Sequence, residues 1–191
     1  MVILVVAALI AAIGGTMAWL TDSPVGITNT FEPAKIKIAI HENESDGFPT
    51  DKTGTTKENV HVQNESSVPI YVRVALVPTW EDAQGTAVAY PASLGDLDIT
   101  WGTDGWYTDG EYYYHTSTVA AGTETKNLIV SAYVDPESAG YTAGYHMNLQ
   151  VLAQAIQAEG IGKDAYDDAK KPVKLAWGFD PAEKPHNLPN S

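Results

Sequence analysis

The sequence predicts an all-β chain, a jelly-roll-like β-sandwich of two antiparallel sheets with short helical insertions. Two observations support this prediction. Short stretches of alternating apolar and polar residues recur along the chain, and turns rich in Gly, Asp, Asn and Pro separate them. Of the 191 residues, 44% are hydrophobic, which is enough for one domain with its own core rather than a disordered chain.

Each expected strand is marked by alternation that ends at a turn or a proline. The expected strands are residues 35–40, 60–63, 70–77, 97–101, 106–107, 111–115 and 128–134. In the first of them Ile36, Ile38 and Ile40 share one face, which we expect to be buried. The third is the strongest, and we expect Pro78 to end it because proline cannot donate a hydrogen bond to a neighbouring strand.

The connections differ in length and composition. Residues 41–58 read as a long acidic loop, and residues 80–95 as a loop with little regular structure. Asp109-Gly110 is the signal for a type I′ turn, so we expect the strands on either side of it to form a hairpin.

The C-terminal third is less uniform. Residues 145–158 alternate like a strand but contain good helix formers, and we favour the strand because six alternating positions outweigh weak propensities. Residues 164–171 are predicted to form a short helix that Pro172 ends, since acidic residues come first and lysines last. Residues 178–191 are rich in proline and are predicted to form a mobile tail.

The first 18 residues have the pattern of a secretory signal peptide. The apolar run over residues 2–13 is shorter than the about 20 residues that a transmembrane helix needs. Thr16 and Ala18 supply the small residues before a cleavage site, so we expect cleavage between Ala18 and Trp19. The basic residues that normally open a signal are missing, which a start site chosen too far downstream would explain. An uncleaved N-terminal anchor and a buried strand are the alternatives.

Charge and cysteine content limit the function. The net charge of −13 disfavours nucleic acid and anionic lipid as partners and favours solubility and divalent cations. Because the chain has no cysteine, it has no disulfide, thiolate metal site or cysteine nucleophile. In an exported domain this composition indicates an exterior protein of the Gram-positive type.

No residue pattern predicts an enzyme. His41-Glu42 begins like the HExxH motif of zinc proteases, but Ser45 stands where the second histidine would be. The other histidines never pair at ligand spacing: His61, His115, His146 and His186. We therefore expect no catalytic residue, no metal and no cofactor.

Two groups of residues raise the question of ligand binding. One group is acidic and would suit calcium, although without EF-hand spacing it reads better as solvated loop acids: Glu42, Glu44, Asp46 and Asp51, and separately Asp104 with Asp109. The other group is aromatic and would suit a sugar, although cross-strand packing is the better interpretation: Trp101, Trp106, Tyr107, Tyr112, Tyr113 and Tyr114.

Two motifs near the N-terminus stand out. Residues 14–22 read Gly-Gly-Thr-Met-Ala-Trp-Leu-Thr-Asp, and Asn29-Thr30-Phe31 follows. Together they resemble the G-G-T-x-A-x-[FL]-T-D box and the N-T-F of TasA/camelysin-type proteins, which a dedicated SipW-type signal peptidase exports. Further segments resemble the BsaA-type branch of clostridial biofilm matrix proteins: residues 68–74, 78–82, 111–114 and 155–159, with Trp106 and Trp177. The resemblance covers nearly the whole chain, apart from the missing basic start and the Pro-rich segment after Trp177.

This resemblance implies a secreted structural subunit of an extracellular biofilm-matrix fibre or pilus. In such fibres the N-terminal strand of one subunit inserts into a groove of the next. The implied division is a signal peptide over residues 1–18, a donor-strand segment over 19–31, a jelly-roll domain over 32–177 and a tail over 178–191. The candidate groove-filling residues are Leu20, Val25, Ile27 and Phe31, and the last three share one face of an extended chain. The acceptor strands cannot be read from the sequence.

The resemblance also implies the partners. These are other copies of the chain in a head-to-tail homopolymer, the SipW-type signal peptidase and other matrix components. Contact with the membrane is expected only through the uncleaved signal, and the protein is expected in the extracellular matrix or at the cell surface. Two alternatives remain open, a camelysin-like secreted metalloprotease and a carbohydrate-binding matrix adhesin.

Overall fold

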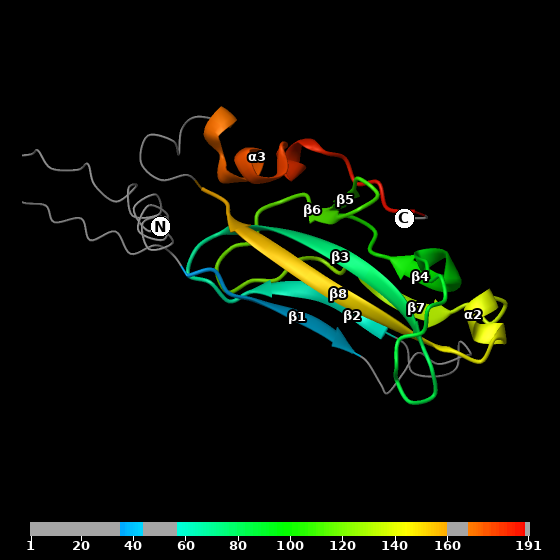
Figure 1. The fold of residues 1–191 in the computed structure, drawn as a ribbon. Helices are drawn as coiled ribbons and strands as arrows, with labels where there is room; N and C mark the ends of the chain where they lie inside the picture. Colours follow the sequence, from blue (N-terminus) through cyan, green and yellow to red (C-terminus); the bar gives the residue numbers. More distant parts are fainter. Residues whose placement is uncertain (1–34, 44–56, 160–167, 190–191) are drawn as a thin grey trace, which may run out of the picture. The chain divides into compact units, whose positions relative to one another are not determined.

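Two four-stranded antiparallel sheets pack as a sandwich, as the sequence predicts (Figure 1). The computed structural model describes residues 35–43, 57–159 and 168–189. Sheet A has the strand order β1-β2-β7-β4, and sheet B has the order β5-β6-β3-β8. The strands are β1 (Ile38–Asn43), β2 (Lys57–Asn64), β3 (Ile70–Glu81), β4 (Leu97–Trp101), β5 (Trp106–Thr108), β6 (Tyr113–His115), β7 (Ile129–Val134) and β8 (His146–Gln157).

Short helices accompany the sheets. The α-helices are α2 (Ala139–Thr142) and α3 (Pro172–Trp177), and the 3-10 helices are η1 (Leu94–Asp96), η3 (Asp168–Lys170) and η4 (Pro181–Glu183). The chain changes sheet at every step from β2 to β5 and again from β6 to β8, as expected of a jelly-roll-like sandwich. The core lies between the sheets, and its most buried large side chains are Trp80, Trp106, Ile70, Leu128, Ile129 and Leu149.

Strand β3 continues to Glu81, so the prediction that Pro78 ends this strand is wrong. Pro78 lies opposite Leu149 of β8. The Ala158 N–H donates to the Pro69 carbonyl oxygen at 2.9 Å, which makes the even-numbered residues of β8 the hydrogen-bonded ones in this antiparallel ladder. Pro78 therefore occupies a position at which β8 needs no N–H from it.

The predicted hairpin forms between β5 and β6, but its turn is not type I′. Thr108 pairs with Tyr113, so four residues connect the strands. A type I′ turn needs positive φ at both central residues, whereas Gly110 has a φ of 96° and Asp109 does not have a positive φ. Instead, the Asp109 carboxylate accepts backbone N–H groups from Glu111 and Tyr112 at 3.0 and 2.8 Å.

The ambiguous segment over residues 145–158 is a strand, which confirms the preferred prediction. Strand β8 pairs with β3 over all 12 of its residues. Met147, Leu149 and Val151 are buried, while the residues between them are exposed. The alternating burial of apolar side chains therefore decides the conformation, and the helix propensity of Ala, Gln and Leu does not.

The first strand begins at Ile38 rather than residue 35, and its predicted burial is wrong in part. Ile38 is half-buried, but Ile36 and Ile40 are each 37% exposed. Ile40 lies opposite Val62, whose side chain is in the core, so Ile40 faces the interior of the sandwich. Its exposure means that the described part of the chain leaves this side of the interior incompletely covered.

The C-terminal segment over residues 178–189, where the sequence predicts a mobile tail, is packed against the domain through buried residues such as Asp180 and Leu188. We call residues 168–189 the strap. Pro172 is the first residue of α3 rather than the end of a helix, as suits a residue without an N–H. Val173 forms a small second core with Tyr71 on the outer face of sheet B, and Leu188 is only 5% exposed. Figure 1 shows the strap running along this sheet.

Candidate functional site

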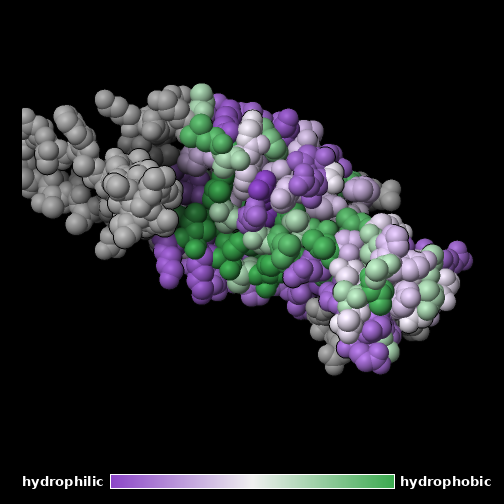
Figure 2. Space-filling model, in the orientation of Figure 1, coloured by the Kyte–Doolittle hydropathy of each residue, from purple (hydrophilic) through white to green (hydrophobic). Residues whose placement is uncertain are grey.

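The most unusual feature is the side of the sandwich where β1 of sheet A and β8 of sheet B lie near each other (Figure 1). We call it the open edge. Among the described residues, β1 pairs only with β2 and β8 only with β3. Figure 2 shows hydrophobic residues gathered over β8 and beside β1 on this side. A long strand edge next to apolar surface is a template for pairing with a further strand.

Apolar side chains from both sheets line the open edge. Ile38 and Ile40 of β1 face the interior and are half-buried and exposed, respectively. On β8, Ala153 and Ala155 also face the interior and are only half-buried, although Val74 opposite Ala153 is almost completely buried. In this part of sheet B, the inward-facing side chains are therefore fully buried at β3 but only partly buried at β8.

The backbone of β8 provides matching polar groups. In an antiparallel strand, the N–H and C=O groups of alternate residues point to opposite neighbours. Since the even-numbered residues of β8 bond to β3, those of Val151, Ala153 and Ala155 point away from β3, toward the open edge. No described residue forms a hydrogen bond with the backbone of these three. The open edge thus combines apolar side chains with a row of backbone donors and acceptors.

One end of the open edge is closed by a buried lysine. The Lys57 ammonium donates to the carbonyl oxygen of Leu149 at 2.6 Å, and its side chain is 3% exposed. The same ammonium lies 3.1 Å from a carboxylate oxygen of Glu42, the last inward-facing residue of β1. Lys57 therefore links sheet A to the edge-facing carbonyl of Leu149 in sheet B.

An irregularity in β2 turns Lys57 inward. Lys57 and Val60 are both buried although they lie three positions apart, which regular alternation does not allow. The pairing of β1 with β2 shifts by one residue in this region, and Asn59 has a φ of 55°. Asn59 is the single non-glycine residue with positive φ in the described part of the chain. A bulge at Asn59 thus redirects the lysine into the sandwich, a common use of bulges.

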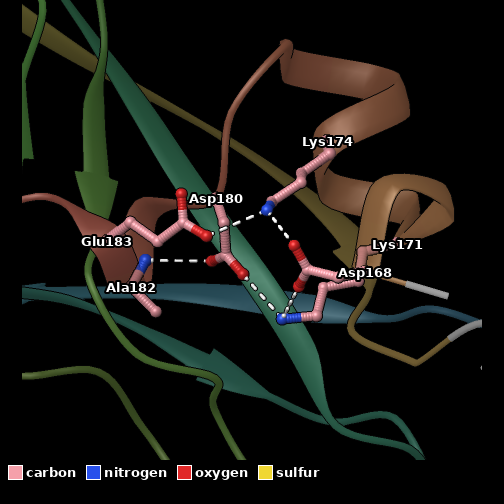
Figure 3. Close-up of polar contacts among 6 residues, drawn as sticks. All are labelled: Asp168, Lys171, Lys174, Asp180, Ala182 and Glu183. Carbon is pink, nitrogen blue, oxygen red and sulfur yellow. Dashed lines mark hydrogen bonds and ion pairs between the residues drawn. The ribbon is translucent and has the colours of Figure 1, made fainter. Parts of the chain in front are cut away.

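The strap carries a second cluster of charges (Figure 3). The Lys171 ammonium lies 2.8 Å from a carboxylate oxygen of Asp168 and 3.1 Å from one of Asp180. Lys174 pairs with Asp168 and lies 2.9 Å from a carboxylate oxygen of Glu183. Asp180 is 2% exposed, so this cluster fixes α3 to the segment that follows it.

The cluster changes the pKa values of its members. Burial by itself would raise the pKa of Asp180, but hydrogen bonds from the Ala182 N–H, Lys171 and Tyr71 outweigh it, and the pKa falls below its usual value. Hydrogen bonds from Lys171 and Lys174 lower the pKa of Asp168 to about 2. Burial, followed by the charge of Asp180, raises the pKa of Tyr71 to about 12.

Acidification is expected to loosen the strap. Both carboxylates have folded-state pKa values below their ordinary ones, so their contribution is complete above about pH 4 and is lost as the pH falls through the folded-state values. We expect the buried Asp180 to contribute about 1.5–3 kcal/mol to the free energy of unfolding at neutral pH, the usual range for a hydrogen bond to a charged group. Urea unfolding of wild type and Asp180→Asn between pH 7 and pH 2 measures it. The difference between the two proteins should shrink below pH 4, and a constant difference would contradict this assignment.

The aromatic residues mostly contact one another, which agrees with packing rather than a sugar-binding face. Trp106 is completely buried. Trp101 and Tyr113 stack with ring centroids 5.0 Å apart. The Arg73 guanidinium lies 4.0 Å from the ring centroid of Tyr112. Because Trp106 belongs to the core, its replacement would test stability and not sugar binding.

The described acidic residues and histidines do not converge on one site. Asp104 pairs with Lys126, whereas Asp109 accepts from the Tyr114 hydroxyl at 2.9 Å. His41 and His61 stack across β1 and β2 with ring centroids 5.3 Å apart. No group of three or more His, Cys, Asp or Glu side chains in residues 35–43, 57–159 and 168–189 is placed to hold a metal ion. Three of the acidic residues considered for calcium lie outside the described residues: Glu44, Asp46 and Asp51.

The N-terminal site residues also lie outside the described part of the chain. They are the cleavage residues Ala18 and Trp19 and the donor residues Leu20, Val25, Ile27 and Phe31. The structure adds an acceptor candidate that sequence reasoning missed, the open edge with Lys57 at its end. The sequence carries a partial signal for it, because Ala153 and Ala155 are small residues at the inward positions of a strand.

Comparison with known proteins gives no match, neither to a family, nor to a curated protein, nor to a solved structure. Within the described residues, no helix has the length and apolar character needed to cross a membrane.

Proposed function

We propose that this chain is a secreted structural subunit of an extracellular fibre of the biofilm matrix. Residues 19–31 of one copy would add a strand to sheet B of the next copy, along the free side of β8. The observation that supports this proposal best is the open edge, with its edge-facing backbone groups and its half-covered Ala153 and Ala155. An added strand would form main-chain hydrogen bonds with the edge-facing backbone groups, and its alternate side chains would cover Ala153 and Ala155.

The lengths of the two parts agree. Val25 and Phe31 are six residues apart, which is about 20 Å in an extended strand. On β8, Val151 and Gln157 are also six residues apart, and this stretch begins just beyond the Leu149 carbonyl that Lys57 occupies. The donor segment can therefore span the part of β8 that remains available.

The connectivity favours assembly into filaments. The donor segment and the open edge are different surfaces. When two copies bind, one of them keeps an unbound donor segment and the other keeps an unbound open edge, so further copies can be added at both ends. A contact of this kind does not close on itself unless the rotation between copies forms a ring. The net charge of −13 keeps free subunits apart until a specific contact forms.

Truncation tests the proposal. Protein beginning at Trp19 is expected to form fibres in negative-stain electron microscopy, whereas protein beginning at Glu32 should stay monomeric because it has no donor segment. Ile27→Asp should also abolish fibres by placing a charge on the apolar face of the donor. Thr28→Asp is the matched control, since its side chain lies on the opposite face of an extended strand. Fibres from the protein that begins at Glu32 would overturn the proposal, as would a stable monomer of the longer protein.

A further inference from the structure

We infer that Lys57 sets the register of the inserted strand by ending the stretch of β8 on which a second copy can pair. The inference rests on the proposed function and adds a specificity-determining residue to it. A strand that paired with all of β8 would need the edge-facing carbonyl of Leu149. That carbonyl already accepts from the Lys57 ammonium at 2.6 Å.

Displacing the lysine is unfavourable. Its side chain is 3% exposed, and its ammonium lies between the Leu149 carbonyl and Glu42, 3.1 Å from the carboxylate of the latter. A strand that took over this carbonyl would deprive a buried charge of one of its partners, and a buried charge is costly to leave under-satisfied. The inserted strand should therefore end before Leu149 and pair with Val151 and the residues that follow.

The donor segment needs such a limit. A strand that slips by two residues keeps the same side chains on the same face, so alternation alone does not choose between registers two residues apart. In an extended strand Val25, Ile27, Asn29 and Phe31 would share one face, and three of them are apolar. A two-residue slip in either direction therefore keeps two of these three apolar residues on the paired stretch, with Ser23 or Pro33 entering at its end. A fixed obstacle at one end of β8 would select one register.

The natural absence of cysteine permits a clean test by disulfide cross-linking. One set of proteins carries Ala153→Cys on β8 and begins at Glu32. The other set begins at Trp19 and carries a single cysteine at Val25, Ile27, Asn29 or Phe31. In wild-type background, one donor position should form nearly all of the cross-linked dimer with residue 153. With Lys57→Met in the acceptor, a second donor position two residues away should also form cross-linked dimer with residue 153.

The outcomes separate the two proposals. If no donor position cross-links to residue 153, the proposed function fails and the inference fails with it. If one position cross-links and Lys57→Met leaves the pattern unchanged, the inference alone is overturned. Lys126→Met is the matched control, because Lys126 is a surface lysine remote in sequence from β8, and its removal should leave the pattern of the wild type.

A second measurement does not require any change at Lys57, whose replacement could impair folding. Met147 lies on β8 on the far side of Leu149 from Ala153, and both side chains are on the same face of the strand. In the wild-type background Met147→Cys should give no cross-link with any donor position. A Met147→Cys cross-link as strong as that of Ala153→Cys would show that strands pair past Leu149 and would overturn the inference.

Discussion

Gly140→Ala is expected to destabilise the protein by about 3 kcal/mol or more, at the upper end of what overpacking usually costs. A Cβ atom at Gly140 would lie 2.0 Å from Cε2 of Trp80 and 2.5 Å from two further ring atoms. The indole cannot move aside easily, because Trp80 is completely buried and its carbonyl accepts from the Val88 N–H at 2.9 Å. For a chain of this size the Tm should fall by roughly 10 °C.

Thermal unfolding followed by circular dichroism measures this effect. Gly95→Ala is the matched control, because a Cβ atom there meets only the Ser93 hydroxyl at 3.4 Å, and its effect should stay within about 0.5 kcal/mol. Combining Gly140→Ala with Trp80→Phe should cost less than the sum of the two single changes, because the smaller ring relieves the overlap. Strict additivity, or a neutral Gly140→Ala, would contradict this packing of α2 on Trp80.

A synthetic peptide of residues 19–31 is expected to stabilise protein that begins at Glu32. A ligand that binds only the folded state adds about 2.7 kcal/mol at 100 times its Kd, which corresponds to a Tm increase of roughly 5–10 °C for a chain of this size. The physical reason is that the peptide covers the half-buried Ala153 and Ala155 and the exposed Ile40. Thermal unfolding over a series of peptide concentrations measures the increase.

Two controls make the peptide experiment specific. A peptide with Val25→Asp and Ile27→Asp should have no effect, because both charges fall on the apolar face. Ala153→Arg in the protein should abolish the response to the unmodified peptide, whereas Leu152→Arg on the outer face of the same strand should preserve it. Leu152 is already 45% exposed, so an arginine there has room in solvent. An equal response of both protein variants would mean that the peptide binds elsewhere.

The fold was predictable because its strands bury alternate side chains. Seven strands and the strand character of residues 145–158 follow from this alternation. Where the prediction failed, tertiary contacts outweighed local residue preferences, and those contacts cannot be read from the sequence. Pro78 is tolerated within β3 because it falls in a non-hydrogen-bonded pair, and that depends on a register with β8 about 70 residues away. The strap packs against the domain despite its prolines, through buried residues such as Val173 and Leu188.

The candidate site was harder to predict than the fold. Alternation in the first strand correctly indicates which way Ile40 faces, but it cannot show that the neighbouring sheet fails to cover it. The acidic loop predicted over residues 41–58 includes Lys57, whose inward position depends on the irregular backbone at Asn59. Asparagine is tolerant of positive φ, yet most asparagines do not adopt it, so the sequence gives no reason to expect a buried lysine here.

The edges of the two sheets differ greatly in length. Strand β8 has 12 residues, whereas β4 and β5, at the other ends of the strand orders, have five and three. Short edge strands offer little for another strand to pair with. Within the described part of the chain, the molecule therefore has one side suited to receiving a strand. A polymer in which each subunit receives one strand at that side would be linear and unbranched. Mechanical load would then pass from copy to copy through one inserted strand at each junction.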